Sequence, residues 1–435
     1  MSAVQIGCMG IACVLLLAAL RIPIGVALGG TAAVGVLLIR GQTAALSILG
    51  AATFDFAAHW TMTAVPMFLF MGNVAYHSGL ATMLYRAARA WLSFLPGGLA
   101  LATTCASAGF AATSGSSVAM AGAMSRLAVP EMLRAGYDKG LASGVVAASG
   151  TLGALIPPSI HFILYATFME TSVSKLLMAG IIPGLLTMAA YFGLVVIRTT
   201  LNPSLAPRTN DAVPMEEKLR LLAQAWPLPI IFIGIIGGIY SGIVTATEAG
   251  AAGSALALIV AALSGRLNRA MLLAVVKDTA GTTAAIFFIA IGAVLFSQFL
   301  TISRVPLVIG GLIRGLSDNL PLFLLMISVF YLVLGMFLDA VGLMLVTLPI
   351  LAPAVSVMGI DVIWFGVIVV KFVEIGLLTP PIGLNLYVVT AAVKGQITFS
   401  EVVRGTSWFL YAEAVVMVLI LSFPQLSLFI PNLMN

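Results

Sequence analysis

The chain has 435 residues, of which 61% are hydrophobic and 8% are charged, and its formal net charge is +5. About a quarter of the residues of a soluble domain are charged, so this composition excludes an ordinary soluble protein. The basic residues lie at the ends of apolar segments and form no run interleaved with aromatic side chains. We therefore expect no nucleic-acid partner.

Long apolar runs recur along the whole chain, for example at 6–20, 226–246, 249–265 and 414–430. A helix that spans a bilayer needs roughly 20 apolar residues, and on that criterion the chain holds about ten or more membrane elements. The short alternating strands of a β-barrel are not evident. The sequence predicts an all-α polytopic membrane protein in contact with the lipid bilayer.

The segment 111–124, "AATSGSSVAMAGAM", is polar at its centre and apolar on both sides. Its hydroxyl residues Thr113, Ser114, Ser116 and Ser117 surround Gly115. A short apolar stretch that turns on small polar residues is typical of a re-entrant helical hairpin, which we expect at about 108–135. The alternative is that these serines are small residues for close helix packing.

The next segment, "GALIPPS" at 153–159, places Pro157 and Pro158 inside an apolar run. Proline lacks an N–H and its ring clashes with the preceding turn, so the pair predicts a broken helix at about 139–170. A break is tolerated in a membrane where the freed backbone groups line a cavity, and transporters place such breaks near the midplane. A packing kink is the simpler alternative.

A polar stretch at 198–222 divides the chain into two halves, and we interpret it as a cytoplasmic linker. Single crossings are expected at 176–197, 226–245 and 249–265. The loop that holds Arg266, Arg269 and Lys277 is also placed in the cytoplasm.

The second half repeats the first at an offset of 223 positions, which carries Pro157-Pro158 onto Pro380-Pro381. The same offset aligns several residues with a specific backbone role: Pro130 with Pro353, Gly136 with Gly359, Asp138 with Asp361, and Gly153 with Gly376. Basic residues surround the first Gly-x-Asp turn and are absent around the second. Since basic residues favour the cytoplasm, the turns lie on opposite faces, which predicts an inverted repeat.

The second hairpin is expected at about 334–358 and the second broken helix at about 361–392. Asp339 aligns with Ser116 and lies in an apolar run, where an acid is a functional candidate; the alternative is a structural acid near the interface. Hydroxyl and carbonyl oxygens with one carboxylate suit Na⁺ better than a transition metal. We expect no cofactor beyond this coupling ion.

Three further polar residues lie close to the breaks. Lys371 and Glu374 have the i, i+3 spacing of a salt bridge on one helix face, and coupling is the alternative role. His161 is interpreted as structural. Asn385 could orient the freed backbone of the second break.

Motifs along nearly the whole chain resemble one family. "FAATSGSSVAMAGAM", "PEMLRAGYDKGLASG", "GTLGALIPPSI", "GIYSGIVTATEAGAAGS" and "FVEIGLLTPPIGLNLYV" are similar to the large membrane subunit of TRAP transporters, the tripartite ATP-independent periplasmic type. The combination of motifs is specific, whereas each motif alone is not.

This resemblance implies an elevator carrier, in which a transport domain with two hairpins slides against a scaffold, driven by a sodium gradient. It implies two partners, a small four-helix membrane subunit and a periplasmic solute-binding protein, and a location in the bacterial inner membrane. We accordingly divide the chain into N-terminal scaffold helices (1–60), a first inverted repeat (61–197), the linker (198–222), and scaffold helices with a second inverted repeat (223–435).

By motif, the resemblance also implies the sodium-binding residues: Ser114, Gly115, Ser116, Ser149, Gly150, Thr151, Leu338, Asp339, Gly376, Thr379 and Pro380. The substrate, a small carboxylate such as a C4-dicarboxylate or sialic acid, is expected at Ser116, Ser117, Pro157, Pro158, Pro381 and Asn385. No catalytic residue is expected.

Other functions fit less well. A stand-alone ion-coupled carrier of the same superfamily remains open, although the Ser-Asn-Thr common at the hairpin tips of such carriers is missing here. An intramembrane serine protease would use Ser114-Gly115 with His161, but in the Gly-x-Ser-Gly motif of such enzymes position 112 would be Gly, and here it is Ala. A passive channel would conduct without an ion gradient. No phosphate loop is visible, which argues against an ATPase.

Overall fold

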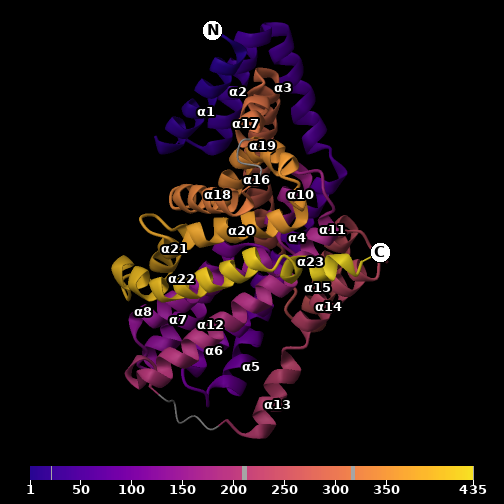
Figure 1. Cartoon of the computed structure of the whole chain (residues 1–435). Helices are drawn as coiled ribbons and strands as arrows, with labels where there is room; N and C mark the ends of the chain where they lie inside the picture. Colours follow the sequence, from indigo (N-terminus) through magenta and orange to yellow (C-terminus); the bar gives the residue numbers. More distant parts are fainter. Residues whose placement is uncertain (21, 208–212, 315–318, 435) are drawn as a thin grey trace.

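A computed structural model describes residues 1–20, 22–207, 213–314 and 319–434. These residues form helices joined by turns, and no strand. The prediction of an all-α fold is therefore confirmed. The chain starts at one end of an elongated molecule and finishes on one side of it (Figure 1).

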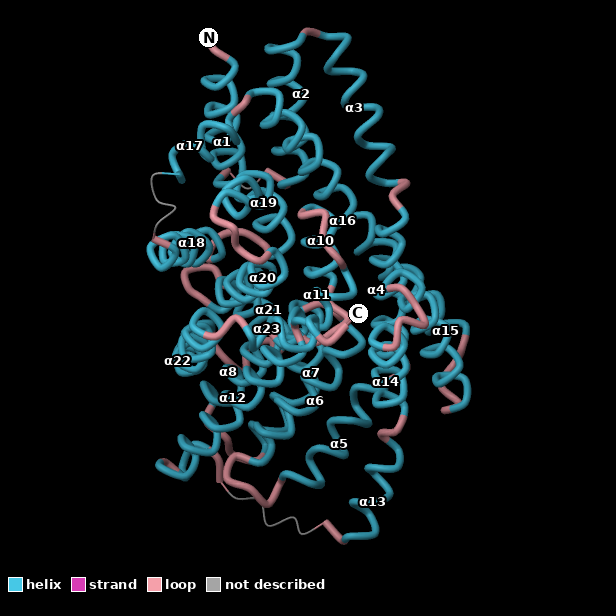
Figure 2. The backbone as a smooth tube through the Cα atoms, turned by 45° about the vertical axis from the view of Figure 1, so that its right-hand side comes forward, coloured by secondary structure: helices cyan, strands magenta, loops and turns pink. Residues whose placement is uncertain are grey.

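The first half begins with α1 (Ala3–Ala19), α2 (Ile24–Arg40) and α3 (Gln42–Ala57), which lie together at one end of the molecule (Figure 2). The chain continues through the short 3₁₀ helix Trp60–Thr63 to α4 (Ala64–His77), α5 (Leu80–Leu92), α6 (Gly98–Ser114), α7 (Ser117–Arg134), α8 (Lys139–Gly150), α9 (Leu152–Leu155), α10 (Ile160–Phe168), α11 (Val173–Ala179) and α12 (Ile181–Leu201).

Beyond the short 3₁₀ helix Pro203–Leu205 come α13 (Met215–Gln224), α14 (Pro227–Tyr240) and α15 (Ala246–Leu263). The remaining helices are α16 (Arg269–Ser303), α17 (Val305–Arg314), α18 (Leu320–Gly335), α19 (Ala340–Val357), α20 (Val362–Leu378), α21 (Leu384–Ala392), α22 (Phe399–Ser422) and α23 (Gln425–Asn432). Lys277 lies inside α16, so its predicted place in a loop is wrong. Part of the predicted linker, 208–212, lies outside the described residues.

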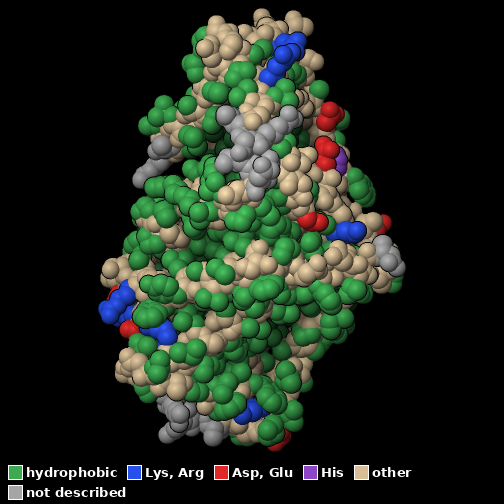
Figure 3. All heavy atoms as spheres, viewed as in Figure 1, with side chains coloured by type: hydrophobic (Ala, Val, Ile, Leu, Met, Phe, Trp, Pro, Cys, Tyr) green, Lys and Arg blue, Asp and Glu red, His purple; other side chains and the backbone are tan. Residues whose placement is uncertain are grey.

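Among the described residues, five helices are long and apolar enough to cross a membrane, and counting each bent pair as one span raises the number to seven. The bent pairs are Lys139–Leu155 with Ile160–Phe168 and Met215–Gln224 with Pro227–Tyr240. Shorter apolar helices are Ala3–Ala18, Ile24–Arg40 and Leu320–Gly335. The predicted total of about ten or more is reached only with these short helices, because prolines and hairpin turns divide the apolar sequence. Figure 3 shows a largely hydrophobic surface with charged side chains toward its edges.

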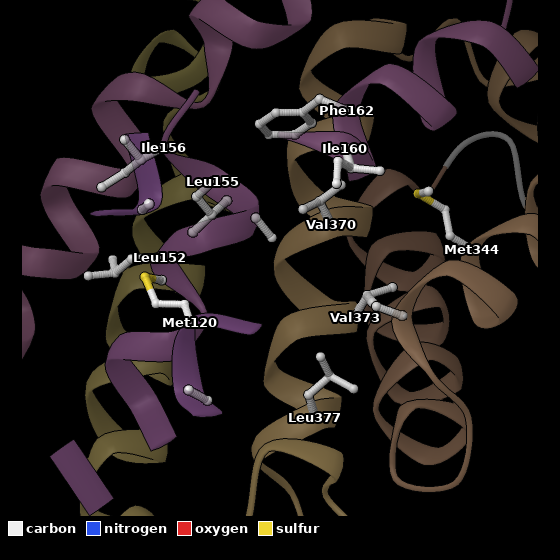
Figure 4. Packing of buried hydrophobic residues seen from close by; sticks show 14 of the residues in the cluster. Met120, Leu152, Leu155, Ile156, Ile160, Phe162, Met344, Val370, Val373 and Leu377 are labelled. Atoms are coloured by element: carbon white, nitrogen blue, oxygen red, sulfur yellow. The ribbon is translucent and has the colours of Figure 1, made fainter. Parts of the chain in front are cut away.

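Equivalent elements of the two halves pack in a reciprocal way. In the first half α7 contacts α21, the helix that follows the second break, and in the second half α19 contacts α10, the helix that follows the first break. Reciprocal contacts of this kind are what a two-fold relation between two repeats produces. Figure 4 shows buried hydrophobic side chains from these parts of the interior, among them Ile160 of α10, Met344 of α19, and Val370 and Val373 of α20.

The two Gly-x-Asp turns lie at opposite ends of α22. After the first turn, Lys139 forms an ion pair with Glu401 near the start of α22, with 3.5 Å between Nζ and Oε1. After the second turn, the indole of Trp364 donates to the carbonyl of Ile420 near its end, at 3.0 Å. Nineteen residues of helix separate these contacts, about 28 Å, which is close to the thickness of a bilayer's hydrocarbon core. This is the arrangement that an inverted repeat requires.

Candidate functional site

The tip of the first hairpin rests directly on the first break. Gly115 joins α6 to α7 with a left-handed φ of +60°. A Cβ atom there would lie 2.8 Å from the carbonyl oxygen of Pro158, so glycine is required for this contact. Ser116 caps α7, its Oγ accepting from the Ala119 N–H at 3.4 Å. Tip and break of the same half therefore meet.

The first break is enclosed by protein. After α9 the chain extends through Ile156, Pro157 and Pro158, the last two joined by a cis peptide bond, and all three residues are buried. The Ser159 hydroxyl then caps α10 by accepting from the Phe162 N–H at 3.4 Å. Two short helices thus end and begin at one buried point, as helix-breaking prolines dictate.

The predicted sodium-site segment 149–151 lies next to the first tip. A Cβ atom at Gly150 would lie 3.2 Å from the Ser117 carbonyl oxygen, so α8 approaches the start of α7 closely. The neighbouring hydroxyls have other partners: Ser149 Oγ donates to Thr104 Oγ1 at 3.2 Å, and Thr151 Oγ1 donates to the Ala148 carbonyl at 2.8 Å.

The second tip is capped by its acid. Asp339 Oδ2 accepts from the Gly342 N–H at 2.9 Å at the start of α19. Leu338 and Asp339 are half-buried. Behind the tip, the end of α18 crosses α20 at a glycine pair, where a Cβ atom on Gly376 would lie 2.6 Å from Gly335 Cα.

The second break is open to the surface. α20 ends at Leu378, and Thr379 and Pro380 are half-buried while Pro381 is exposed. Pro380 and Pro381 are joined by a cis peptide bond, like the first pair. Thr379 Oγ1 donates to the Ile375 carbonyl at 2.7 Å, and Gly383 takes a left-handed φ of +57° before α21.

Residues of both halves meet beside the first tip. Ser117 Oγ donates to Glu374 Oε1 at 2.6 Å across 257 positions of sequence. From α21, the Asn385 amide nitrogen would lie 3.3 Å from a Cβ atom on Gly150. Both amide atoms of Asn385, and the second oxygen of Glu374, are buried without a hydrogen-bond partner. The predicted Asn385 therefore joins the first-half set rather than the backbone of its own break.

The predicted salt bridge between Lys371 and Glu374 is wrong. Lys371 instead forms an ion pair with Glu413 of α22 and donates to Thr187 Oγ1 of α12 at 2.9 Å. Tyr191 of α12 donates to the same Glu413 carboxylate. All of these side chains are fully buried. Lys371 binds these groups rather than Glu374 because the neighbouring helices α12 and α22 place polar side chains within its reach.

Glu413 was missed by the sequence analysis. It lies in "FLYAEAVVMVLILS", an apolar run with a single acid, and the rule that marks Asp339 as a candidate applies equally to Glu413. No local pattern names its partner, however, because Lys371 lies 42 positions earlier.

A cavity of about 690 Å³ opens beside the first tip, between α4, α16 and the α6–α7 hairpin. Its lining includes Ser114 and Ser116 from the tip, Arg126 from α7 and Lys277 from α16. Of the substrate residues predicted from sequence, Ser116 lines this cavity, whereas Ser117, Pro157, Pro158, Pro381 and Asn385 are not among its lining residues.

The fold defines the class of the protein, a multi-pass α-helical membrane protein with two broken helices, and solved structures share this fold. The Alcanivorax borkumensis YdaH transporter aligns with a TM-score of 0.62 and 14% identity over 88% of this chain and 89% of its own. Neisseria gonorrhoeae MtrF aligns with a TM-score of 0.58 and 15% identity over 96% and 95%. At such identities the likeness concerns the fold alone.

Sequence relatives identify the family. Residues 11–426 match the family of the tripartite ATP-independent periplasmic transporter, DctM component. The C4-dicarboxylate large permease protein DctM of Pseudomonas aeruginosa is 35% identical over 87% of this chain and 88% of its own. The sialic acid large permease protein SiaM of Vibrio cholerae is 32% identical over 92% and 95%. The ectoine/5-hydroxyectoine protein UehC of Ruegeria pomeroyi is 34% identical over 86% of each.

The chain therefore belongs to the DctM family and is a large permease subunit of a TRAP transporter. The resemblance inferred from the motifs is confirmed. The relatives carry different substrates in their names, so membership of the family leaves the substrate of this chain open.

Proposed function

We propose that this chain is the large subunit of a sodium-coupled importer of organic acids that works by an elevator mechanism in the bacterial inner membrane. A small four-helix membrane subunit and a periplasmic solute-binding protein are its partners. The observation that carries the proposal is the contact of an oxygen-rich tip, Ser114 to Ser117, with the break at Pro158. Freed carbonyls and hydroxyls are the donors that a hard alkali cation prefers.

The residues present fit a sodium ion. Ser114 Oγ is buried without a partner, which leaves its lone pairs free for a cation. In the second half, Asp339 uses Oδ2 for its cap, and its carboxylate adds the one negative charge at a tip. We assign sodium binding to Ser114–Ser116 with Ser149–Thr151 in the first half, and to Leu338–Asp339 with Gly376, Thr379 and Pro380 in the second.

In the proposed cycle, sodium binds first and orders the two tips, and the acid then binds beside them. Ser116, Ser117 and Asn385 supply hydrogen bonds to the acid, and the proline pairs keep the nearby backbone free. The loaded hairpins next move against the scaffold helices. The sodium gradient supplies the energy, so no nucleotide is needed.

Reconstitution tests the proposal. This chain, its small subunit and its binding protein are placed in liposomes, and uptake of labelled organic acids is measured with and without an inward sodium gradient. Uptake that needs both the gradient and the binding protein is the expected result. Uptake without the binding protein would favour a stand-alone carrier, and flux without any ion gradient would favour a channel.

Two variants test the site assignment in the same assay. Ser116→Ala and Asp339→Asn should each raise the sodium concentration needed for half-maximal uptake. If both variants leave sodium-dependent uptake unchanged, the sodium sites lie elsewhere in the chain.

A further inference from the structure

The cavity beside the first tip has the size and position of a ligand site. Its volume of about 690 Å³ lies within the range of small-molecule pockets, roughly 300–1,000 Å³. One wall is the α6–α7 hairpin and the other is formed by α4 and α16, from distant parts of the chain. A ligand held there touches the tip on one side and α4 and α16 on the other.

Two cationic side chains face this cavity from opposite walls. Arg126 of α7 donates from Nη2 to the Tyr76 hydroxyl at 2.6 Å, and Lys277 extends from α16. Within the described ranges, neither forms an ion pair. The one acid of the lining, Asp278, is already bound to His77 at 2.8 Å. Two cations and one acid thus line the cavity, which leaves a net positive charge for a ligand.

The lining of the cavity includes an unsatisfied hydroxyl. Ser114 is 7% exposed, and its Oγ has no hydrogen-bond partner. The lone pairs of this hydroxyl are assigned to the proposed cation, and its O–H donor is still unused, so a ligand acceptor that takes this proton gains free energy. Ser116 stands beside it at the start of α7, where the helix end favours negative charge.

The distance between these groups sets the shape of the ligand. Arg126 follows Ser116 by ten residues, which is about 15 Å along α7. Helical side chains lean toward the N-terminus of their helix, so the guanidinium reaches back toward the tip and shortens the gap. A small acid with a carboxylate at one end and a second polar group at the other spans the remaining distance between the guanidinium and the tip.

We propose that this cavity binds the transported organic acid, with its carboxylate between Arg126 and Lys277 and its second polar group at Ser114 and Ser116. This assignment rests on the proposed function and revises its substrate contacts. Arg126, Lys277 and Ser114 are added, whereas Ser117 and Asn385 are buried outside the cavity lining and no longer contact the acid. A bidentate contact with arginine explains selection of a planar carboxylate.

Protection from labelling tests the site without relying on transport. Thr282 is an exposed lining residue of α16, so Thr282→Cys is made in a full-length chain with Cys8, Cys13 and Cys105 replaced by Ala. The protein is reconstituted in lipid with sodium present. The rate of maleimide labelling is measured with acetate, succinate, gluconate or N-acetylneuraminate. At least one acid with two polar ends should slow labelling tenfold or more. A cysteine at Ser204, an exposed residue of the polar stretch after α12 and outside the cavity lining, should label equally under all conditions.

Charge variants then identify the groups that hold the carboxylate. Arg126→Gln should raise the acid concentration for half-protection about ten- to hundredfold, the usual worth of a bond to a charged group. Lys277→Gln should raise it less, and Arg126→Lys should fall between Arg126→Gln and the native chain. Arg134→Gln removes the same charge from an exposed position of the same helix outside the cavity, and it should leave half-protection unchanged.

The outcomes separate this site from the wider function. If no acid protects Thr282→Cys, or if both charge variants leave protection unchanged, the cavity is not the substrate site, even where sodium-dependent uptake persists. Protection that depends on Arg126, in a reconstituted system that shows no sodium-dependent uptake, would keep the site and overturn the proposed coupling.

Discussion

The two broken helices share a backbone plan but are held in different ways. The first, α8, crosses α22 through glycines, and a Cβ atom on Gly144 would lie 2.5 Å from the carbonyl carbon of Gly405. The second, α20, is bound to α12 and α22 through the buried charge of Lys371. At the repeat offset, Lys371 corresponds to Ala148. The repeat thus preserves where a helix breaks and not what fixes it to its neighbours.

The two breaks also differ in how far they are exposed at the surface. Pro157 and Pro158 are buried, whereas Pro381 is exposed. A pair of equivalent breaks with unequal access is what an inverted-repeat carrier needs in any one of its states. The contrast between a close-packed first half and a charge-fixed, more open second half can be tested by substitution.

The largest effect is expected from Lys371→Met. This change leaves the carboxylate of Glu413 buried without its cation, which costs about 3–5 kcal/mol of folding free energy. The measurement is the thermal unfolding midpoint of the purified chain in detergent, which should fall steeply. The matched double variant, Lys371→Met with Glu413→Leu, removes both charges and should recover most of the loss. A double variant as unstable as the sum of its single variants would contradict the pairing.

The first half should be most sensitive to added volume. Gly405→Ala places a Cβ atom 1.8 Å from the carbonyl oxygen of Gly140, and because the obstacle is backbone the helices must separate. We expect a loss of about 3 kcal/mol, the upper end for overpacking. Gly237→Ala on α14 is the control, since nothing lies within 4 Å of its Cβ position. An unfolding midpoint as high in Gly405→Ala as in the control would refute the close crossing.

The contact between the halves should have an intermediate effect. Ser117→Ala leaves buried Glu374 without its hydrogen bond, at a cost of about 1–3 kcal/mol. Ser125→Ala on the same helix removes only a bond to the Ala121 carbonyl and should cost less. Thermal unfolding of the two variants gives the comparison, and equal midpoints would show that the Ser117 bond does not tie the halves together.

Backbone features of both halves were predictable because a few residue types determine them locally. Asp138 and Asp361 cap α8 and α20, each by accepting backbone N–H bonds, as their aligned Gly-x-Asp turns indicate. The proline pairs lie between helices because proline lacks a backbone N–H and its ring clashes with the preceding helical turn. Such effects act within a few residues, and an offset between two copies makes them visible in the sequence.

Contacts between distant helices were not predictable in the same way. The partner of Lys371 and the cavity between α4, α16 and the first hairpin depend on how helices far apart in sequence pack. A single sequence reports which side chains are unusual in an apolar run, but it does not report which of them face each other. The salt bridge expected within α20 is wrong for this reason.

The two tips offer the smallest and most informative contrast. The cap of Asp339 is a carboxylate bond of 2.9 Å, and that of Ser116 is a longer hydroxyl bond of 3.4 Å. Replacing either residue by Ala should cost about 1 kcal/mol, and more at Asp339 because its charge also favours the helix N-terminus. Asparagine caps a helix about as well as aspartate, so Asp339→Asn should change the unfolding midpoint little.

Sodium dependence then separates a cap from an ion ligand. If Asp339 binds sodium, Asp339→Asn should raise the sodium concentration for half-maximal uptake at least tenfold, about 1.4 kcal/mol, while stability is kept. Ser116→Ala should raise it less, because a neutral hydroxyl contributes less to a cation than a carboxylate does. An Asp339→Asn variant with native sodium dependence would make Asp339 a structural cap, and the charge at the second tip would then have no part in coupling.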